Sequence, residues 1–399
     1  MLHRTGNPMR HVVVAVDASR NHGRGVIGGV GAYAREVGNW ILHVDVADPH
    51  HLQGGQIHGD GLIISGMQDM ASWLGERRLP IVNVTDQGLS GVVPTVCVDN
   101  ARVGQRAAEH LLRRGFRQFA GFTQDDFPVS EHRYAGFART VEAAGFECER
   151  VPFPEFGGRI AKWLAAKRPP LGVMAFHDSR ARELAETAWE AGWRIPGDLA
   201  IVGVDNDPLF CEFGHVTLSS VVQPLHRIGY HAASMLDAWL DGGGGPEAAP
   251  APDTRLAPIT LIVRQSSDVW ITENPHICGA LEYIRRNIHV CFGVEQVADA
   301  VGLSRRHLGM LCREHLGQTT SKLITQARLD RAKQLLAREA QPIAEIAAAC
   351  GFNSASYFGA VFHKNTGQTP GDYRAAVVGK PLSRRVGPNG VQFACGNEF

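Results

Sequence analysis

The chain has 399 residues, of which 44% are hydrophobic and 20% are charged. This length exceeds one ordinary core and predicts two or three domains, and the apolar content excludes wholesale disorder. No run approaches about eighteen consecutive apolar residues, and Met1 to Arg10 lack the apolar core of a secretory signal. The eight cysteines are scattered without a C-x-x-C pair, which favours reduced thiols over a disulfide framework or a zinc site. We therefore expect a cytoplasmic protein without membrane span, metal or cofactor.

The net charge of zero is made of two unequal parts. Residues 1–273 carry 25 Lys and Arg against 31 Asp and Glu, whereas residues 274–399 carry 15 against 9, a balance of +6. A basic C-terminal segment on an acidic body predicts that only this segment meets a polyanion. Chance asymmetry of solvated faces would give the same sums, so the charge needs a motif beside it.

From residue 11 to about 265, short β-rich runs alternate with helical stretches. Near-continuous apolar strands separated by helices predict parallel sheets covered on both faces, and the length predicts two α/β lobes. The predicted strands are His11–Asp17, Trp40–Val46, Asp60–Ser65, Pro80–Thr85, Phe119–Thr123, Gly172–Phe176, Ala200–Val204 and Pro258–Arg264. The predicted helices are Gly25–Glu36, Gln68–Arg78, Asn100–Arg114, Glu131–Ala144 and Arg180–Ala191.

Between residue 276 and about residue 378 the sequence predicts helices only. We expect an α/β body over residues 10–265, a linker over 266–275, a helical domain over 276–378 and a disordered tail over 379–399.

An internal repeat divides the helical domain into two similar units. Val294–Gly302 matches Ile343–Gly351 at an offset of 49, and Gly317–Thr319 matches Gly367–Thr369 after a slip of one residue. Each unit reads as a short helix, a glycine turn and a second helix, with Ser304 or Ser354 as N-cap. The helix predicted between the units, Thr320 to about Arg338, spans roughly 28 Å. That length is enough to place the two second helices about one turn of B-DNA, ~34 Å, apart.

The second helix of each unit carries the side chains that can reach base edges. Arg305 and Arg306 are predicted to contact guanine or phosphate, while Leu308, Cys312, Phe358 and Phe362 fall at core spacing. Any single charge here could equally be a solvated surface group. The full set of predicted DNA contacts is Ser304, Arg305, Arg306, His307, Arg313, Ser354, Ser356, Tyr357, His363 and Lys364.

The second unit resembles the AraC-type DNA-binding signature. The resemblance rests on Ile343-Ala-Glu-Ile-Ala-Ala-Ala-Cys-Gly-Phe352, Ser356-Tyr-Phe358, Phe362-His-Lys364 and Gly367-Gln-Thr-Pro370, and it covers about residues 276–376. It implies a seven-helix domain that binds a DNA half-site of roughly one and a half turns. Gly309, Gly359 and Ala360 are small where family members often carry contacting side chains. DNA shape and backbone contacts are therefore expected to carry more of the affinity.

The α/β body resembles the sugar-binding domains of LacI/GalR-type regulators. Asp60–Ser65, Val98–Asn100, Arg133–Phe137, Gly203–Asn206 and Leu218–Pro224 follow in the order found in that family. The resemblance implies two lobes of the periplasmic-binding-protein type, three crossovers and a sugar held in the cleft. The sequence departs from the family in that the first predicted strand begins at His11, without the helix-turn-helix that usually comes before it.

Sugar hydroxyls both donate and accept, so carboxylates, amides and an arginine fork at strand ends suit them. By analogy with the family, Arg133, Asp205 and Gln223 are the first candidates. Asp178 could instead cap a helix, and Asp205 could belong to a simple turn. The complete predicted set is Asp17, Asp86, Arg133, His177, Asp178, Asp205 and Gln223.

Together these features predict a DNA-binding transcription regulator controlled by a sugar. The combined resemblance implies a pentose effector, first of all D-xylose, a double-stranded DNA operator, a homodimer and a possible contact with RNA polymerase. An alternative is an enzyme-like or amidotransferase-like body fused to an AraC-type domain, but no strained nucleophile turn is found. A transport solute-binding protein is a third reading, against which the basic helical segment argues.

Overall fold

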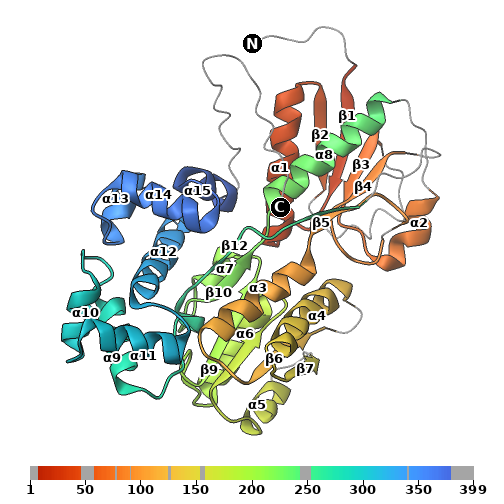
Figure 1. Cartoon of the computed structure of the whole chain (residues 1–399). Helices are drawn as coiled ribbons and strands as arrows, with labels where there is room; N and C mark the ends of the chain where they lie inside the picture. The colour runs from red at the N-terminus through yellow and green to blue at the C-terminus, as the bar shows by residue number, and fades with distance from the viewer. Residues whose placement is uncertain are drawn as a thin grey trace.

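The structure is a computed structural model that describes residues 8–45, 58–76, 79–89, 91–124, 127–152, 158–242, 253–338 and 341–378. The predicted disordered tail lies outside these residues. These residues form two α/β lobes and a helical domain (Figure 1).

Lobe one is built on a parallel four-stranded sheet in the order β2-β1-β3-β4. Its central strand is fully buried from Val12 to Val16, which is why the sequence there is an uninterrupted valine-rich run. Helix α8 returns from the far lobe to pack against α1, as Figure 1 shows. The elements are β1 Arg10–Ala15, α1 Asn21–Val37, β2 Trp40–Asp45, β3 Gly61–Ile64, α2 Ala71–Gly75, β4 Ile81–Asn83 and α8 Leu225–Asp241.

Lobe two is built on a six-stranded sheet in the order β12-β10-β9-β8-β6-β7. Its pairs are parallel except for β10 with β12, which run antiparallel. The strands are β6 Phe119–Thr123, β7 Cys148–Pro152, β8 Leu171–Met174, β9 Leu199–Val204, β10 Ser219–Val222 and β12 Thr260–Ile262. The helices are α3 Asn100–Arg113, α4 Pro128–Ala143, α5 Gly158–Ala165, α6 Asp178–Glu190 and α7 Pro208–Cys211.

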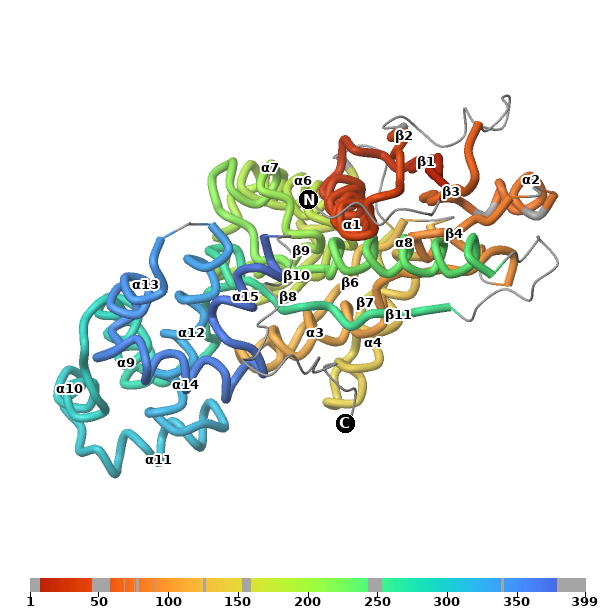
Figure 2. Tube along the Cα trace, turned by 90° about the horizontal axis from the view of Figure 1, so that it is seen from above, coloured from red at the N-terminus to blue at the C-terminus, as the bar shows by residue number. Residues whose placement is uncertain are grey.

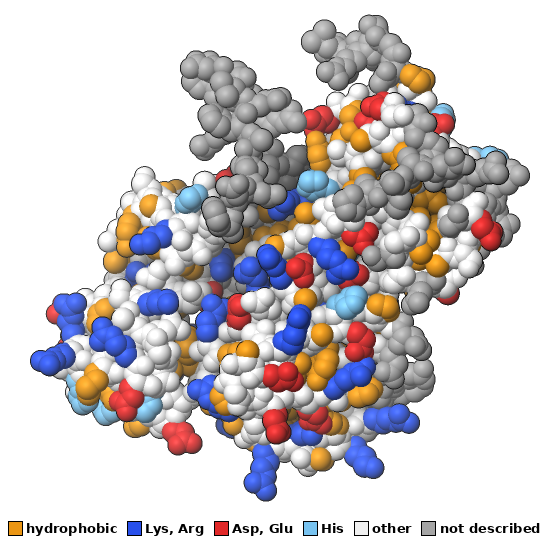
Figure 3. Space-filling model, turned by 45° about the vertical axis from the view of Figure 1, so that its right-hand side comes forward, with side chains coloured by type: hydrophobic (Ala, Val, Ile, Leu, Met, Phe, Trp, Pro, Cys, Tyr) orange, Lys and Arg blue, Asp and Glu red, His pale blue; other side chains and the backbone are white. Residues whose placement is uncertain are grey.

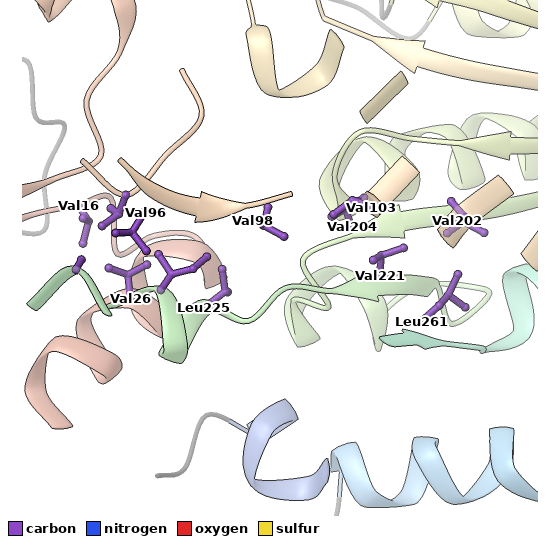
Figure 4. Packing of buried hydrophobic residues seen from close by; sticks show 14 of the residues in the cluster. Val16, Val26, Val96, Val98, Val103, Val202, Val204, Val221, Leu225 and Leu261 are labelled. Atoms are coloured by element: carbon purple, nitrogen blue, oxygen red, sulfur yellow. The ribbon is translucent and has the colours of Figure 1, made fainter. Parts of the chain in front are cut away.

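The chain passes between the lobes three times, after β5 (Val96–Val98), after β10 and after β11 (Thr254–Leu256). Strands β5 and β11 pair in parallel, so two of the crossings run side by side. One buried apolar cluster continues across them, from Val16 and Val26 in lobe one past Val98 to Val204 and Val221 in lobe two (Figure 4). The lobes therefore share a core at their hinge side.

The helical domain contains seven helices in the described residues between 275 and 378, and it lies to one side of the lobes (Figure 2). Each repeat unit has its own core, one around Leu308 and Cys312 and the other around Phe358 and Phe362. The helices are α9 Pro275–Arg286, α10 Val294–Ala300, α11 Arg305–Leu316, α12 Thr320–Arg338, α13 Ile343–Ala349, α14 Ala355–Thr366 and α15 Pro370–Val378.

The repeat seen in the sequence is also a repeat of burial. Residues 305–320 and 355–370 show the same order of exposed and buried positions. Gly317 and Gly367, which end α11 and α14, both adopt left-handed backbone with φ of 66° and 75°. Glycine is suited to that conformation because it carries no Cβ.

The segment predicted as a linker, 266–275, is fixed to lobe two at its start. The Ser266 hydroxyl donates to the Ile201 carbonyl at 2.6 Å, and the Ser267 hydroxyl lies 2.8 Å from His110 Nε2. Both serines are fully buried. The first residues of this segment are therefore part of the lobe-two structure, and they fix where the helical domain begins.

Candidate functional site

A cavity of about 440 Å³ lies between the two lobes, and we call it the effector cleft. Of the seven residues predicted to contact an effector, it is lined by six: Asp17, Asp86, Arg133, His177, Asp205 and Gln223. These side chains come from both lobes and from the crossing segments, and they are mostly polar. The cleft therefore presents several donors and acceptors to one small molecule.

Arg133 projects from α4 and is buried. Its helix lies close against α3 because Gly104 and Gly136 stand at the contact, where a Cβ would come within 2.0 Å of a carbonyl oxygen of the other helix. The Arg133 Nε donates to Asn100 Oδ1 at 2.9 Å, and a terminal nitrogen donates to the Phe176 carbonyl. Burial lowers the pKa of Arg133, and the nearby carboxylate of Asp205 opposes that shift.

Asp205 follows β9 on a strained backbone. It has φ of 106° and the next residue, Asn206, has φ of 53°; left-handed backbone costs a non-glycine residue about 1–3 kcal/mol. The Asp205 carboxylate accepts a hydrogen bond from Gln223 Nε2 and lies 3.9 Å from Arg133. Burial raises the pKa of Asp205, whereas Arg133 lowers it. The strained turn thus aims a carboxylate at the cleft beside a guanidinium.

Asp86 closes the cleft beside the crossing strands. Its Oδ2 accepts from Asn100 Nδ2 at 3.1 Å and from Arg255 Nη1 at 3.2 Å, and it lies 2.8 Å from His132 Nδ1. Arg255 belongs to β11, so this carboxylate connects one crossing strand with both helices of the α3–α4 pair. A carboxylate in this position holds the cleft in shape in addition to facing a ligand.

Two histidines face the cleft as neutral rings. Burial lowers the pKa of His177 to about 3, with a further contribution from Arg20. Burial and Arg133 lower the pKa of His22 to about 4. A neutral imidazole offers one donor and one acceptor, which matches the two capacities of a sugar hydroxyl. The His177 Nδ1 lies 2.8 Å from the Ser179 hydroxyl, which leaves Nε2 for a ligand.

Asp178 does not line the cleft, unlike the other predicted effector residues. Its carboxylate is buried behind the wall, where it accepts from the Ser220 hydroxyl at 2.7 Å and from the Asp207 backbone N–H at 2.8 Å. Burial and the Asp205 charge raise its pKa to about 7. It is also the first residue of α6 and does not cap that helix, because His177 occupies the N-cap position. Asp178 therefore supports the Asp205–Asp207 turn from behind.

The cleft is also lined by residues that were not among the seven predicted to contact an effector. An aromatic ring, that of Phe127, also lines the cleft, whereas Trp193 packs against the lobe-two core. Asn100 could have been predicted to lie at the edge of the cleft, because it begins α3 directly after Asp99, the N-cap of that helix. The unselected polar residues are Arg20, His22, Ser65, Thr85, Gln87, Asn100 and Gln124.

The lobes are bonded to each other across the mouth of the cleft. Arg24 of α1 forms a 2.9 Å ion pair with Asp207, and Asn21 Nδ2 donates to the Asp205 carbonyl at 2.8 Å. Residues 205–207 thus face the cleft, the opposite lobe and the buried Asp178 at once.

A chain of polar contacts leads from this turn to the helical domain. Arg264 donates to Asn206 Oδ1 at 2.7 Å, and its Nε lies 3.2 Å from Glu212 Oε1. The same glutamate accepts from Arg338 Nε at 2.9 Å. Arg338 ends α12, the helix between the two repeat units. The effector cleft and the helical domain are therefore connected through a series of four polar side chains in contact, which are Asn206, Arg264, Glu212 and Arg338.

The predicted DNA contacts all lie on the surface of the helical domain. Ser304 and Ser354 accept hydrogen bonds from the backbone N–H groups of His307 and Tyr357, each at 3.2 Å, and so cap α11 and α14. Tyr357 is 61% exposed. The exposed residues of the predicted set are Ser304, Arg305, Arg306, His307, Arg313, Ser354, Ser356, Tyr357, His363 and Lys364.

Gly309 and Gly359 leave open space on the second helices. A Cβ placed on either would meet no atom within 4 Å. The space around both glycines would admit a larger side chain, so packing within the domain does not require glycine there.

The part of the chain that the structure describes holds no helix long and apolar enough to span a membrane. Within the same residues, no group of three or more His, Cys, Asp or Glu side chains is placed to hold a metal ion.

Known families match both parts of the chain. Periplasmic binding protein-like domains match residues 108–267, and the periplasmic binding proteins and sugar-binding domains of the LacI family match residues 55–157. A helix-turn-helix domain family matches residues 297–376. These matches and the geometry define a DNA-binding transcription regulator that responds to a sugar.

Individual relatives make the assignment narrower. The xylose operon regulatory protein of Escherichia coli (strain K12) is 30% identical over 392 residues, which cover 92% of this chain and 97% of that protein. The homologue from Haemophilus influenzae is 29% identical and covers 70% of this chain and 74% of its own length. The solved structure of the xylose-binding transcription activator xylR is 28% identical, with a TM-score of 0.60 over 92% of this chain and 98% of that one. The chain belongs to the family of the xylose operon regulatory proteins.

Proposed function

We propose that D-xylose is the effector and that it binds in the effector cleft. The observation that carries this proposal is the group formed at the meeting point of the lobes by buried Arg133, buried Gln223 and partly buried Asp205. A guanidinium, a carboxylate and an amide together can pair with several adjacent hydroxyls of one pentose. Support comes from the relatives, which are named as regulatory proteins of xylose operons.

The proposed effect of the sugar is to stabilise the closed arrangement of the lobes. A ligand shifts a conformational equilibrium only by its difference in affinity for the two states. Asp205 can supply that difference, because the turn that aims its carboxylate into the cleft also contacts Asn21 and Arg24 of lobe one. Closure would then act on the helical domain through Arg264, Glu212 and Arg338.

The proposed output is altered binding of a DNA operator. In this proposal residues 10–265 form the sugar-binding domain and 276–378 the DNA-binding domain, joined by 266–275. The exposed N-terminal ends of α11 and α14 enter successive major grooves. A homodimer would place two such domains on paired half-sites, where RNA polymerase could be contacted.

Calorimetry tests the proposed effector. The full chain is titrated with D-xylose, L-arabinose and D-ribose, and D-xylose is expected to bind at sub-millimolar concentration and more tightly than the other two. Arg133→Gln should abolish the heat of binding, since it removes the charge and fork geometry at the centre of the cleft. The matched control is Arg139→Gln, an exposed arginine of the same helix, which should bind normally. Absence of binding by all three pentoses in the folded wild-type protein would reject the assignment.

A further inference from the structure

A second polar cavity lies at the contact between lobe two and the helical domain, and we call it the seam pocket. It has a volume of about 200 Å³ and is formed between α3 and α12. Arg106 and Arg113 face it from α3, and Lys322 and Lys333 face it from α12. Figure 3 shows Lys and Arg side chains spread across the face where the helical domain meets the α/β body.

The lining of the seam pocket holds five cations, and four of them are not balanced by carboxylates; the fifth, Arg114, pairs with Asp268 and Asp330. Asp330 is the acidic residue of its lining, and that side chain already accepts from Gln326 Nε2 at 2.7 Å and pairs with Arg114 at 3.3 Å. Within the described part of the chain, Arg106, Arg113, Lys322 and Lys333 form no ion pair. Positive charge is therefore concentrated in a partly enclosed space.

Lys333 is the least exposed of these four cations. Burial lowers its pKa, and the charges of Arg113 and Arg106 lower it further, against the attraction of Asp330. His110 forms part of the wall as a neutral ring, because burial holds its pKa well below the usual value. An anion in the pocket would remove the repulsion among these cations.

The lining suits a phosphate group of a small molecule. Arginine and lysine bind phosphate oxygens through charge-assisted hydrogen bonds, and the side-chain amides of Gln318 and Asn365 add uncharged donors, although one Nδ2 proton of Asn365 is already donated to the Val361 carbonyl. A nucleic-acid backbone is disfavoured by position. The walls of the pocket include α3 and Thr260 of the α/β body, whereas the predicted DNA contacts all lie on the helical domain, the nearest in sequence being His363 and Lys364 beside Asn365.

We propose that the seam pocket binds a phosphate-bearing small molecule. Because α3 belongs to the body and α12 to the helical domain, a bound phosphate fastens one to the other. The protein would then respond to a second ligand, an anion, in addition to the ligand of the effector cleft. The binding step itself does not depend on the identity of the sugar.

The test uses the full chain in phosphate-free buffer, titrated with inorganic phosphate in a calorimeter. Saturable binding at millimolar concentration or tighter is expected. Arg106→Ala and Lys333→Met should each weaken it at least tenfold. The matched control is Arg102→Ala, one turn earlier on α3 and paired with Asp99 at 3.3 Å, which should bind phosphate within twofold of wild type. Circular dichroism verifies that each variant is folded.

Three results would overturn the proposal: no saturable heat with phosphate, equal weakening by Arg102→Ala, or reduced operator affinity in the two pocket variants without any phosphate binding by wild type. The last result would assign the pocket to DNA phosphates. Titration with D-xylose in parallel separates this inference from the proposed effector, since phosphate binding should persist even if no pentose binds.

Discussion

Glu212→Gln should uncouple the effector cleft from DNA binding while leaving both sites intact. Glu212 lies between Arg264, which contacts the Asp205–Asn206 turn, and Arg338 at the end of α12. Glutamine has nearly the same size but no charge, so it weakens both contacts without creating a cavity. The variant isolates the proposed transmission step because Glu212 lines neither the effector cleft nor the predicted DNA surface.

The burial of the two arginines sets the expected magnitude. The Arg264 side chain is 4% exposed and that of Glu212 is 28% exposed, so solvent screens their ion pair less than an exposed one, and we expect it to be worth about 1 kcal/mol or more. The Arg338 side chain is 35% exposed, and solvent screening reduces that contact to about 0.2–1 kcal/mol. The coupling free energy between the effector cleft and the helical domain cannot exceed the free energy of the weaker of these two contacts. Losing about 1 kcal/mol of coupling changes the effect of sugar on DNA affinity about fivefold.

Fluorescence anisotropy of a labelled operator fragment measures this effect directly. The ratio of the operator Kd without and with saturating D-xylose should move about fivefold toward one in Glu212→Gln, while the Kd for D-xylose itself stays within about threefold. Glu190→Gln, on the exposed end of α6 in the same lobe, is the matched control. An unchanged ratio in Glu212→Gln would refute this route of transmission.

Three further predictions concern other parts of the molecule. Arg306→Ala should weaken operator binding in gel retention by about tenfold or more, since it removes a base or phosphate contact; Arg285→Ala, an exposed arginine of α9 paired with Glu282, should not, and equal loss in both would contradict a specific role. Gly359→Ala should raise the free energy of unfolding by about 0.5–1 kcal/mol, because alanine favours the helix and its Cβ meets open space; a lower melting temperature by circular dichroism would contradict that geometry. The pKa of His177 falls to about 3 in the folded protein, so its stabilising contribution is present above the unfolded value near 6.5 and is lost as the pH falls toward 3. Between pH 7 and pH 5 that loss is about 2 kcal/mol. His177→Gln should therefore lose about that much less stability than wild type over this interval, measured by chemical denaturation, and an equal loss would show that His177 titrates normally.

The helical domain could be predicted almost completely from the sequence. Its signals are local: serine N-caps, glycine turns and apolar residues at helical spacing lie within a few residues of the positions they control. The predicted long helix Thr320–Arg338 has the bounds observed for α12. Leu308, Cys312, Phe358 and Phe362 are buried as their spacing predicted. The two-lobed α/β fold class was confirmed for the same reason, since its long apolar strands are buried on both faces.

The strands β5, β7, β10 and β11 and the helices α5, α7 and α8 escaped prediction. Strands β5 and β11 have three residues each and exist because they pair with each other across 158 positions of the chain. No local pattern of that length distinguishes a strand from a loop. Strand β7 lies at the edge of its sheet with exposed residues, and so lacks the continuous apolar run that marks the central strands.

The sequence by itself determined the chemical types at the cleft, because polar residues at the ends of buried parallel strands converge on one edge of a sheet. Only the tertiary structure decided which of them face the cavity. Asp178 and His177 are adjacent, yet the first turn of α6 directs the carboxylate inward to Ser220 and leaves the imidazole on the cleft wall. The contact of Arg338 with Glu212 joins residues 126 positions apart. Such a pairing depends on how the α/β body and the helical domain pack together, so it cannot be predicted from local sequence patterns.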